Sequence, residues 1–224
     1  LGEEEAIAAV VNSNDLTEEL AESAWWAMQT AENARSMLAK KAIAKSAIGK
    51  QLAQFLIEFL PFEEEPVDML TSIRLVLQPG LISPEEVLSL WRKAKTKNTL
   101  YVGFLDILPD NIPEPVDEHV DYETIRLHLS ELLAANNPYA LKLCELLSAK
   151  GQTFLKTAEA AFKRPPNYDV VAALIEAIRR YVFVQHTEAG QNMTEYSLGL
   201  TPDGKIPTDI NEITAVVEGI CNQS

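Results

Sequence analysis

The segment PPNYDVVAALIEAIRRYV, residues 165–182, contains the pattern on which the fold prediction rests. Its two prolines bar a regular helix before Asn167, and asparagine is among the residues that cap helix N-termini. Apolar residues then recur at helical spacing as far as Arg179 and Arg180, and the helix dipole favours cations at a helix C-terminus. The segment therefore predicts an amphipathic helix with a defined start and end.

Similar start and stop signals recur through the chain. SPEE at residues 83–86 offers a serine cap, a proline for the first turn and two carboxylates. NNPYALKLCELLSAKG at 136–151 begins with an Asn-Pro start and ends with a glycine typical of helix ends. We expect an all-α protein of about nine or ten helices in antiparallel hairpins, arranged either as an α-solenoid or as an irregular multi-helix bundle.

One predicted helical region is unusually long. Small residues follow one helix face through residues 20–38, and bulky apolar residues follow one through 48–60. Whether 17–60 forms one long helix or two depends on Gly49 and the Ala-Lys stretch before it, since a glycine costs about 1 kcal/mol against alanine in a helix. We expect a break or kink between about 39 and 49.

Two stretches lack the helix pattern. The turn sequence TPDG between short apolar pairs predicts one small β-hairpin near 197–207, before a last helix. Three prolines in LPDNIPEPVD bar a helix there, so we expect 109–117 to be an exposed link that proteases cut. It would join an N-terminal helical half, 1–108, to a C-terminal half, 118–224. One continuous domain is the alternative.

Charge and composition limit the function. The chain has 19 Lys and Arg against 33 Asp and Glu, a net charge of −14, which argues against wrapping nucleic acid or adhering to anionic lipid. No apolar run approaches the roughly 18 residues of a membrane span. The two cysteines show no metal or disulfide spacing, so we expect reduced thiols in the cytoplasm. The first residue is Leu, which indicates a trimmed N-terminus and is compatible with a removed signal.

The cations gather in two blocks, at residues 35–50 and 92–97. One interpretation is that both are solvated helix faces. The other is that the blocks converge into one basic groove that receives an acidic segment of a partner or of another copy. Residues 106–145, with nine acids and two cations, would provide such a segment. The candidate partner-binding cations are Arg35, Lys40, Lys41, Lys45, Lys50, Arg92, Lys93, Lys95 and Lys97.

Trp25 and Trp26 are also candidates for partner binding. Adjacent residues on a helix cannot point the same way, so one ring should pack in the core. The other should lie at the edge of the core or on a partner, because aromatic side chains are enriched in interfaces.

Metal-capable side chains cluster once, between residues 117 and 128. No Glu-x-x-His or His-x-x-x-His spacing occurs, so we expect a solvated, acid-rich helix start, with no metal and no cofactor. The weak candidate ligands are Asp117, His119, Asp121, Glu123 and His128.

Two segments resemble the second half of a HEAT-type helical hairpin. PPNYDVVAALIEAIRRYV and EPVDMLTSIRLVL, residues 65–77, share a proline start, an aspartate, an apolar helix and an arginine near its end. The resemblance covers about a quarter of the chain and has no fixed period. It implies a non-catalytic α-solenoid that binds partners on a concave face.

From these patterns we predict a non-catalytic protein-interaction module, namely a scaffold, adaptor or regulatory subunit, with homo-oligomers also open. The first alternative is a helical-bundle metal-dependent enzyme that uses the acid and histidine cluster at 117–128. The second is a helical-repeat nucleic-acid binder that uses the basic blocks 35–50 and 92–97.

Overall fold

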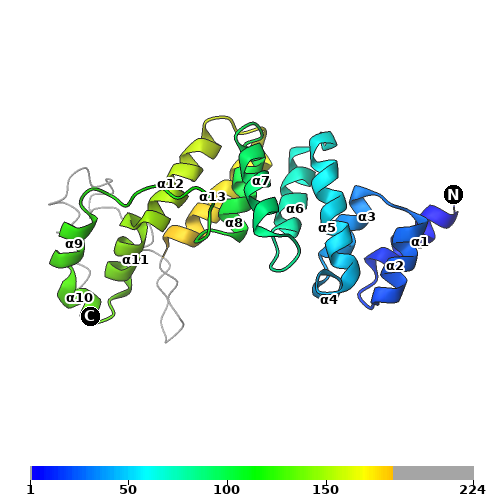
Figure 1. Ribbon diagram of the computed structural model, residues 1–224, viewed down its shortest axis with the longest axis horizontal. Helices are drawn as coiled ribbons and strands as arrows, with labels where there is room; N and C mark the ends of the chain where they lie inside the picture. Colours follow the sequence, from blue (N-terminus) through cyan, green and yellow to red (C-terminus); the bar gives the residue numbers. More distant parts are fainter. Residues whose placement is uncertain (1, 184–224) are drawn as a thin grey trace. The chain divides into compact units, whose positions relative to one another are not determined.

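The computed structural model describes residues 2–183, which belong to one unit of packed helices. The predicted hairpin near 197–207 and the helix expected after it lie outside the described residues. Figure 1 shows the helices in order. They are α1 Gly2–Asn12, α2 Glu18–Ala27, α3 Ala31–Leu38, α4 Lys41–Ala44, α5 Ala47–Phe59, the 3₁₀ helix η1 Leu60–Phe62, α6 Pro66–Val76, α7 Pro84–Ala94, α8 Thr99–Ile107, α9 Tyr122–His128, α10 Ser130–Ala134, α11 Pro138–Leu147, α12 Ala149–Phe162 and α13 Tyr168–Val182.

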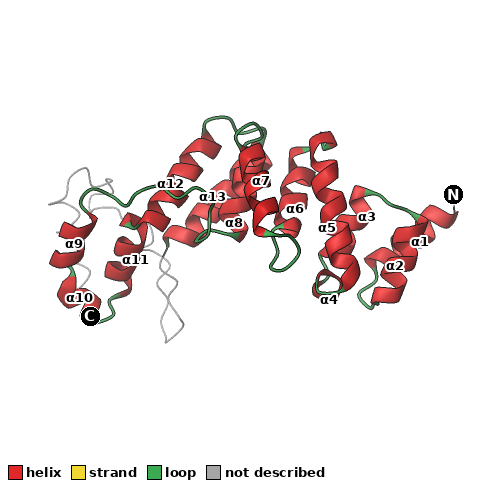
Figure 2. Cartoon of the chain, viewed as in Figure 1, coloured by secondary structure: helices red, strands yellow, loops and turns green. Residues whose placement is uncertain are grey.

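The all-α prediction is confirmed for this part of the chain. Helices make up 72% of residues 2–183, and no strand occurs among them (Figure 2). The described part alone holds thirteen α-helices, more than expected for the whole chain, because several predicted helices are divided into shorter ones.

The predicted helix ends are supported by side-chain caps. Ser83 forms a complete capping box with Glu86, in which each side chain bonds the backbone amide of the other residue. Asn167 accepts the amide hydrogen of Val170 at 3.0 Å and so starts α13. Local sequence signals therefore set these helix starts.

The long segment 17–60 breaks earlier than the predicted kink. The Thr30 hydroxyl caps α3 by accepting the amide hydrogen of Asn33, and the Asn33 side chain donates to the Met28 carbonyl oxygen at the end of α2. These bonds end one helix and start the next, so α2 and α3 are separate. Further breaks before α4 and before α5 fall inside the predicted range 39–49.

The same tight helix junction occurs twice. The motif Ser-Ala-x-Gly stands at 46–49, where α5 starts, and at 148–151, where α12 starts. Each serine hydroxyl donates to the carbonyl oxygen three residues earlier, at 2.9 Å and 2.6 Å. A Cβ on Gly49 would lie 2.6 Å from a backbone oxygen of the preceding turn, and one on Gly151 would lie 2.3 Å away. Only glycine fits this close approach.

Replacing Gly49 by Ala should therefore destabilise the protein by about 1–3 kcal/mol, although alanine normally favours a helix over glycine. Gly151→Ala should behave alike, because its junction has the same geometry. Urea unfolding measures the effect, and Gln51→Ala, at an exposed site of α5, is the control. A stabilised Gly49→Ala variant would show that the two helices do not approach this closely.

Helix α8 lies at the centre of the packing. It contacts α6, α7, α12 and α13. Toward the N-terminus, α5 contacts both α6 and α3, and farther along the chain α11 contacts α12, α9 and α10. Its sequence TLYVGFLDI is apolar on nearly every side, as expected of a helix that is buried all round. A Cβ on Gly103 would lie 2.4 Å from the Ile73 side chain, so α6 and α8 pack at close range.

A nearly buried carboxylate joins three helices. The side chain of Asp106, near the end of α8, is 7% exposed and pairs with Arg74 of α6 at 2.5 Å and with Arg180 of α13. The two arginines belong to 65–77 and 165–182, the segments that resemble a HEAT-type hairpin. Both segments therefore form helices that meet the same acid.

Asp106→Asn should lower the free energy of unfolding by about 2 kcal/mol, as measured by denaturant titration. Removing one partner of a fully buried ion pair costs more than this loss. The loss here is smaller because Arg74 and Arg180 are partly exposed, so water can solvate them after the substitution. Glu123→Gln, which removes an exposed acid from Arg126, should cost less than about 0.5 kcal/mol. Equal losses in the two variants would contradict a central role for Asp106.

The proline-rich segment 109–117 packs against the helices. Ile112 is buried in the core, and the Glu114 carboxylate accepts the indole N–H of Trp91 at 3.2 Å and pairs with Lys95 at 3.1 Å. These two bonds lower the pKa of Glu114, so it stays ionised at pH values where ordinary carboxyls take up a proton. The prolines exclude a helix here, as predicted, but the exposed link that we expected is held at several points and lies within one packed unit.

Among cleavages within residues 2–183, the first should therefore fall at 118–121, where Val120 is 90% exposed, and not at 109–117. Brief digestion with a protease of low specificity, followed by intact mass measurement, locates the cut. Glu114→Ala should open 109–117 to cleavage. Early cuts next to Ile112 in the unmodified protein would show that the segment is not held.

Candidate functional site

The first basic block is divided between two places. Arg35 on α3 pairs with Glu63 at 2.7 Å and with Asp68 at 3.2 Å, and its side chain is only 14% exposed. Both acids lie at or near the start of α6, so Arg35 ties α3 to α6. This arginine is occupied within the fold and is not free for a partner.

The other cations of this block form what we call the α4–α5 lysine face. Ile43 and Ile48 are buried, which turns the lysines of α4 and of the first turn of α5 toward solvent. Ala47 at the start of α5 donates its amide hydrogen to the Glu18 carboxylate at 2.9 Å, so that helix end already has an acceptor. No side chain within residues 2–183 pairs with the four lysines of the face. They are Lys40, Lys41, Lys45 and Lys50, the first half-buried and the others exposed.

The second block is partly used by the fold. Lys97 donates its ammonium hydrogens to the carbonyl oxygens of Leu60 and Pro61, at 3.1 Å and 3.3 Å. These carbonyls lie in η1, directly after α5, so Lys97 adds hydrogen bonds to acceptors at this helix end. Lys95 is paired with Glu114 as described above. The cations of this block that stay exposed without a described partner are Arg92 and Lys93.

The two blocks do not converge. The lysine face surrounds the first turn of α5, whereas Lys97 contacts the backbone just beyond its last turn. Thirteen helical residues separate these ends by about 20 Å. We therefore no longer expect one basic groove formed by both blocks.

The two adjacent tryptophans point in different directions. Trp25 is 4% exposed and packs edge-to-face on Phe55, with ring centroids 4.8 Å apart. Trp26 is 87% exposed. One ring therefore belongs to the core, and the other remains a candidate contact for a partner.

The metal-capable residues of 117–128 do not converge on one point. Nowhere in residues 2–183 do three His, Cys, Asp or Glu side chains gather as they would around a metal ion. His119 accepts the amide hydrogen of Asp121 at Nδ1, and the His128 ring contacts a backbone carbonyl of its own helix at 2.7 Å. Burial raises the pKa of the Cys144 thiol, which makes it a poor nucleophile. These positions offer little to an enzyme mechanism.

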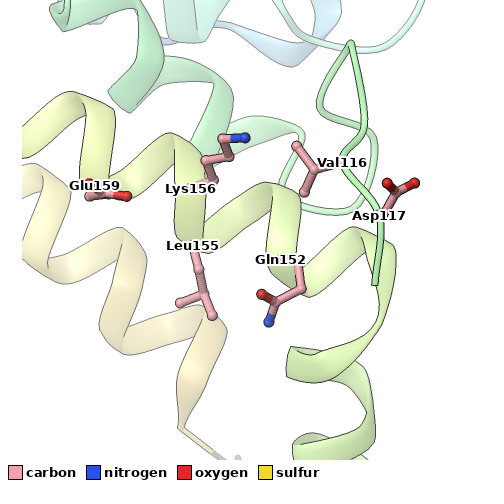
Figure 3. Close-up of a pocket in the computed structure, with 6 residues that line it drawn as sticks. All are labelled: Val116, Asp117, Gln152, Leu155, Lys156 and Glu159. Carbon is pink, nitrogen blue, oxygen red and sulfur yellow. The ribbon is translucent and has the colours of Figure 1, made fainter. Parts of the chain in front are cut away.

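A shallow hollow lies where the segment after Ile112 crosses α12 (Figure 3). The amide of Val116 donates to the Thr153 hydroxyl at 3.0 Å and fixes the crossing. No Ser, Cys or His lines this hollow, so it lacks the usual parts of a nucleophilic site. Its lining residues are Val116, Asp117, Gln152, Leu155, Lys156 and Glu159.

A second hollow, which we call the turn groove, forms where three interhelical turns meet. The turns are 60–65, 95–98 and 163–167, which directly follow α5, α7 and α12, respectively. The Asn98 side chain donates to the carbonyl oxygens of Ala160 and Arg164 at 3.2 Å and 3.4 Å. With Lys97 it ties the three turns together. The lining residues are Glu63, Glu64, Pro66, Met69, Lys95, Thr96, Lys97, Asn98, Thr99, Arg164 and Pro166.

Sequence reasoning missed the turn groove because its three turns lie far apart in the chain. The contacts of Asn98 join residues 62 and 66 positions away. The one local sign is that Lys97 and Asn98 follow a predicted helix end, where such side chains can bond carbonyl groups of helix C-termini.

Comparisons with known proteins add no relative: no family model, no curated protein and no solved structure matches the chain. Among the described helices, none combines the length and apolar character needed to cross a membrane.

Proposed function

We propose that this protein is a non-catalytic protein-interaction module that binds an acidic segment of a protein partner on the α4–α5 lysine face. One observation carries the proposal. The four lysines of this face have no acidic partner among residues 2–183, although the chain contains 33 acids. Some exposed cations elsewhere are paired, as Lys163 is with Glu159 and Arg179 with Glu176, and others are single, whereas this face gathers four unpaired lysines within residues 40–50.

The electrostatics favour binding over stabilisation. Exposed charges typically change stability by less than about 0.5 kcal/mol, so the fold has little use for this face. A local cluster of like charge in a chain of opposite net charge can instead steer an oppositely charged partner and fix its register. Such attraction weakens as salt rises, because the Debye length is about 8 Å at physiological ionic strength.

The HEAT-type resemblance stays part of the proposal. Its support is that both resembling segments form helices that contact α8 and place an arginine on Asp106. The repeated Ser-Ala-x-Gly junction is also what a protein built from recurring helical units would contain. A helical-repeat scaffold that presents charged surfaces to partners is consistent with both features.

The charge-reversal variant Lys41→Glu/Lys45→Glu tests this function. The variant, the unmodified protein and the control Lys150→Glu/Lys156→Glu are each immobilised and incubated with an extract of the source cells. The control changes two exposed, unpaired lysines of α12 and so gives the same net charge. Quantitative mass spectrometry should find proteins that the unmodified chain and the control retain and that the lysine-face variant loses by about fivefold or more.

The retained proteins should carry acidic segments and should elute between low and high salt. Melting temperatures of the two variants should agree within a few degrees, since both sets of lysines are exposed. Identical captured sets for all three proteins would end the proposal. Capture of nucleic acid instead of protein by the lysine face, tested by nuclease treatment, would favour the nucleic-acid alternative.

A further inference from the structure

The turn groove has apolar residues within a mostly polar lining. They are Met69, which is 6% exposed, and the prolines Pro66 and Pro166. The chain neighbours of the groove include two strongly exposed rings, Phe62 at 72% and Tyr168 at 83%. Exposed aromatic side chains are enriched in protein-binding surfaces, and these two lie close to lining residues in the chain.

The groove also has more positive than negative charge available. Lys97 is held by neutral carbonyl groups, so no acid cancels its charge. The Arg164 guanidinium is exposed and has no described partner. The lining itself holds three cations, Lys95, Lys97 and Arg164, against two acids, Glu63 and Glu64. Most of this chain has the opposite balance, with a net charge of −14.

The protein already holds one proline-rich acidic segment beside this groove. Segment 109–117 buries the apolar side chain of Ile112 and, two positions later, pairs the acid Glu114 with Lys95. Lys95 is itself part of the groove lining. An apolar residue followed two positions later by an acid, in a proline-rich segment, is thus a chemistry that this face accepts.

We propose that the turn groove is a second docking site, which binds a proline-rich acidic segment of another protein. An apolar side chain of that segment lies over Met69, and a carboxylate is held by Lys97 and Arg164. Prolines restrict the backbone of such a segment before binding, so that less conformational entropy is lost on docking. The site is distinct from the α4–α5 lysine face, because the two lie at opposite ends of α5.

The test uses the full chain and a fluorescein-labelled peptide, LPDNIPEPVD, which has the sequence of residues 108–117. Fluorescence anisotropy at low salt measures its affinity. Arg164→Glu should weaken binding by about tenfold or more, the effect of losing one charge-assisted hydrogen bond. Lys163→Glu is the matched control, because the neighbouring Lys163 pairs with Glu159 and does not line the groove. The affinity of the Lys163→Glu variant for the peptide should stay within about twofold of that of the unmodified protein.

A second variant tests the groove without changing charge. Thr96 is exposed and lines the groove, so Thr96→Trp should fill it and also abolish binding. Circular dichroism and melting temperature confirm that each variant is folded. No binding of the peptide to the unmodified protein at about 1 mM overturns the proposal, as does an equal loss in Arg164→Glu and Lys163→Glu.

Lys41→Glu/Lys45→Glu separates the two proposed surfaces. Peptide binding by this variant should equal that of the unmodified protein. If it loses the peptide while Arg164→Glu keeps it, the peptide binds the lysine face, and the groove proposal fails while the proposed function stands. If the captured proteins are unaffected by the lysine-face variant but the peptide still requires Arg164, the proposed function fails while the groove proposal stands.

Discussion

The pairing of Asp106 with two arginines is the constraint around which the described helices are arranged. A carboxylate with so little exposure must be compensated, and Arg74 and Arg180 supply the charge from α6 and α13. Because Asp106 lies in a helix that is otherwise apolar and central, this pairing fixes how α6 and α13 lie on α8. The turns before α6, α8 and α13 are the three that meet in the turn groove. The geometry of that surface therefore depends on a contact at the other end of the same helices.

The turns are held by a different interaction, the capping of helix C-termini by residues of a neighbouring turn. Lys97 and Asn98 donate to carbonyl groups in η1, directly after α5, and in the last turn of α12. Carbonyls at helix C-termini lack the usual donor four residues on, so side chains of a neighbouring turn can bond them. Neutral carbonyls satisfy the hydrogen bonds of Lys97 but leave its charge uncancelled. The same side chain can thus support the fold and attract an acidic ligand.

The cations of this acidic protein consequently have two roles. Arg35, Lys95 and Lys97 lock contacts between elements that are distant in sequence. The lysines around α4 are excluded from such contacts, because buried isoleucines take the inward positions of these short helices. The basic block 35–50 therefore divides into Arg35, which joins α3 to α6, and four lysines that form an unpaired surface. This division is the reason for our proposal that a partner binds the lysine face.

The amino-acid sequence by itself determined the helical class and many helix boundaries, because these depend on local effects. The caps of Ser83 and Asn167 act within three residues, and apolar spacing is read over a few turns. The same local rules applied at Thr30, where the cap and its partner Asn33 were readable but the alanine-rich face favoured a continuous helix. Only the tertiary structure decided which cations are paired, how segment 109–117 is held and that three turns form a groove. Those outcomes rest on contacts such as Arg35 with Glu63 and Arg180 with Asp106, between residues 28 and 74 positions apart, and no local pattern encodes which distant partner a charge will meet.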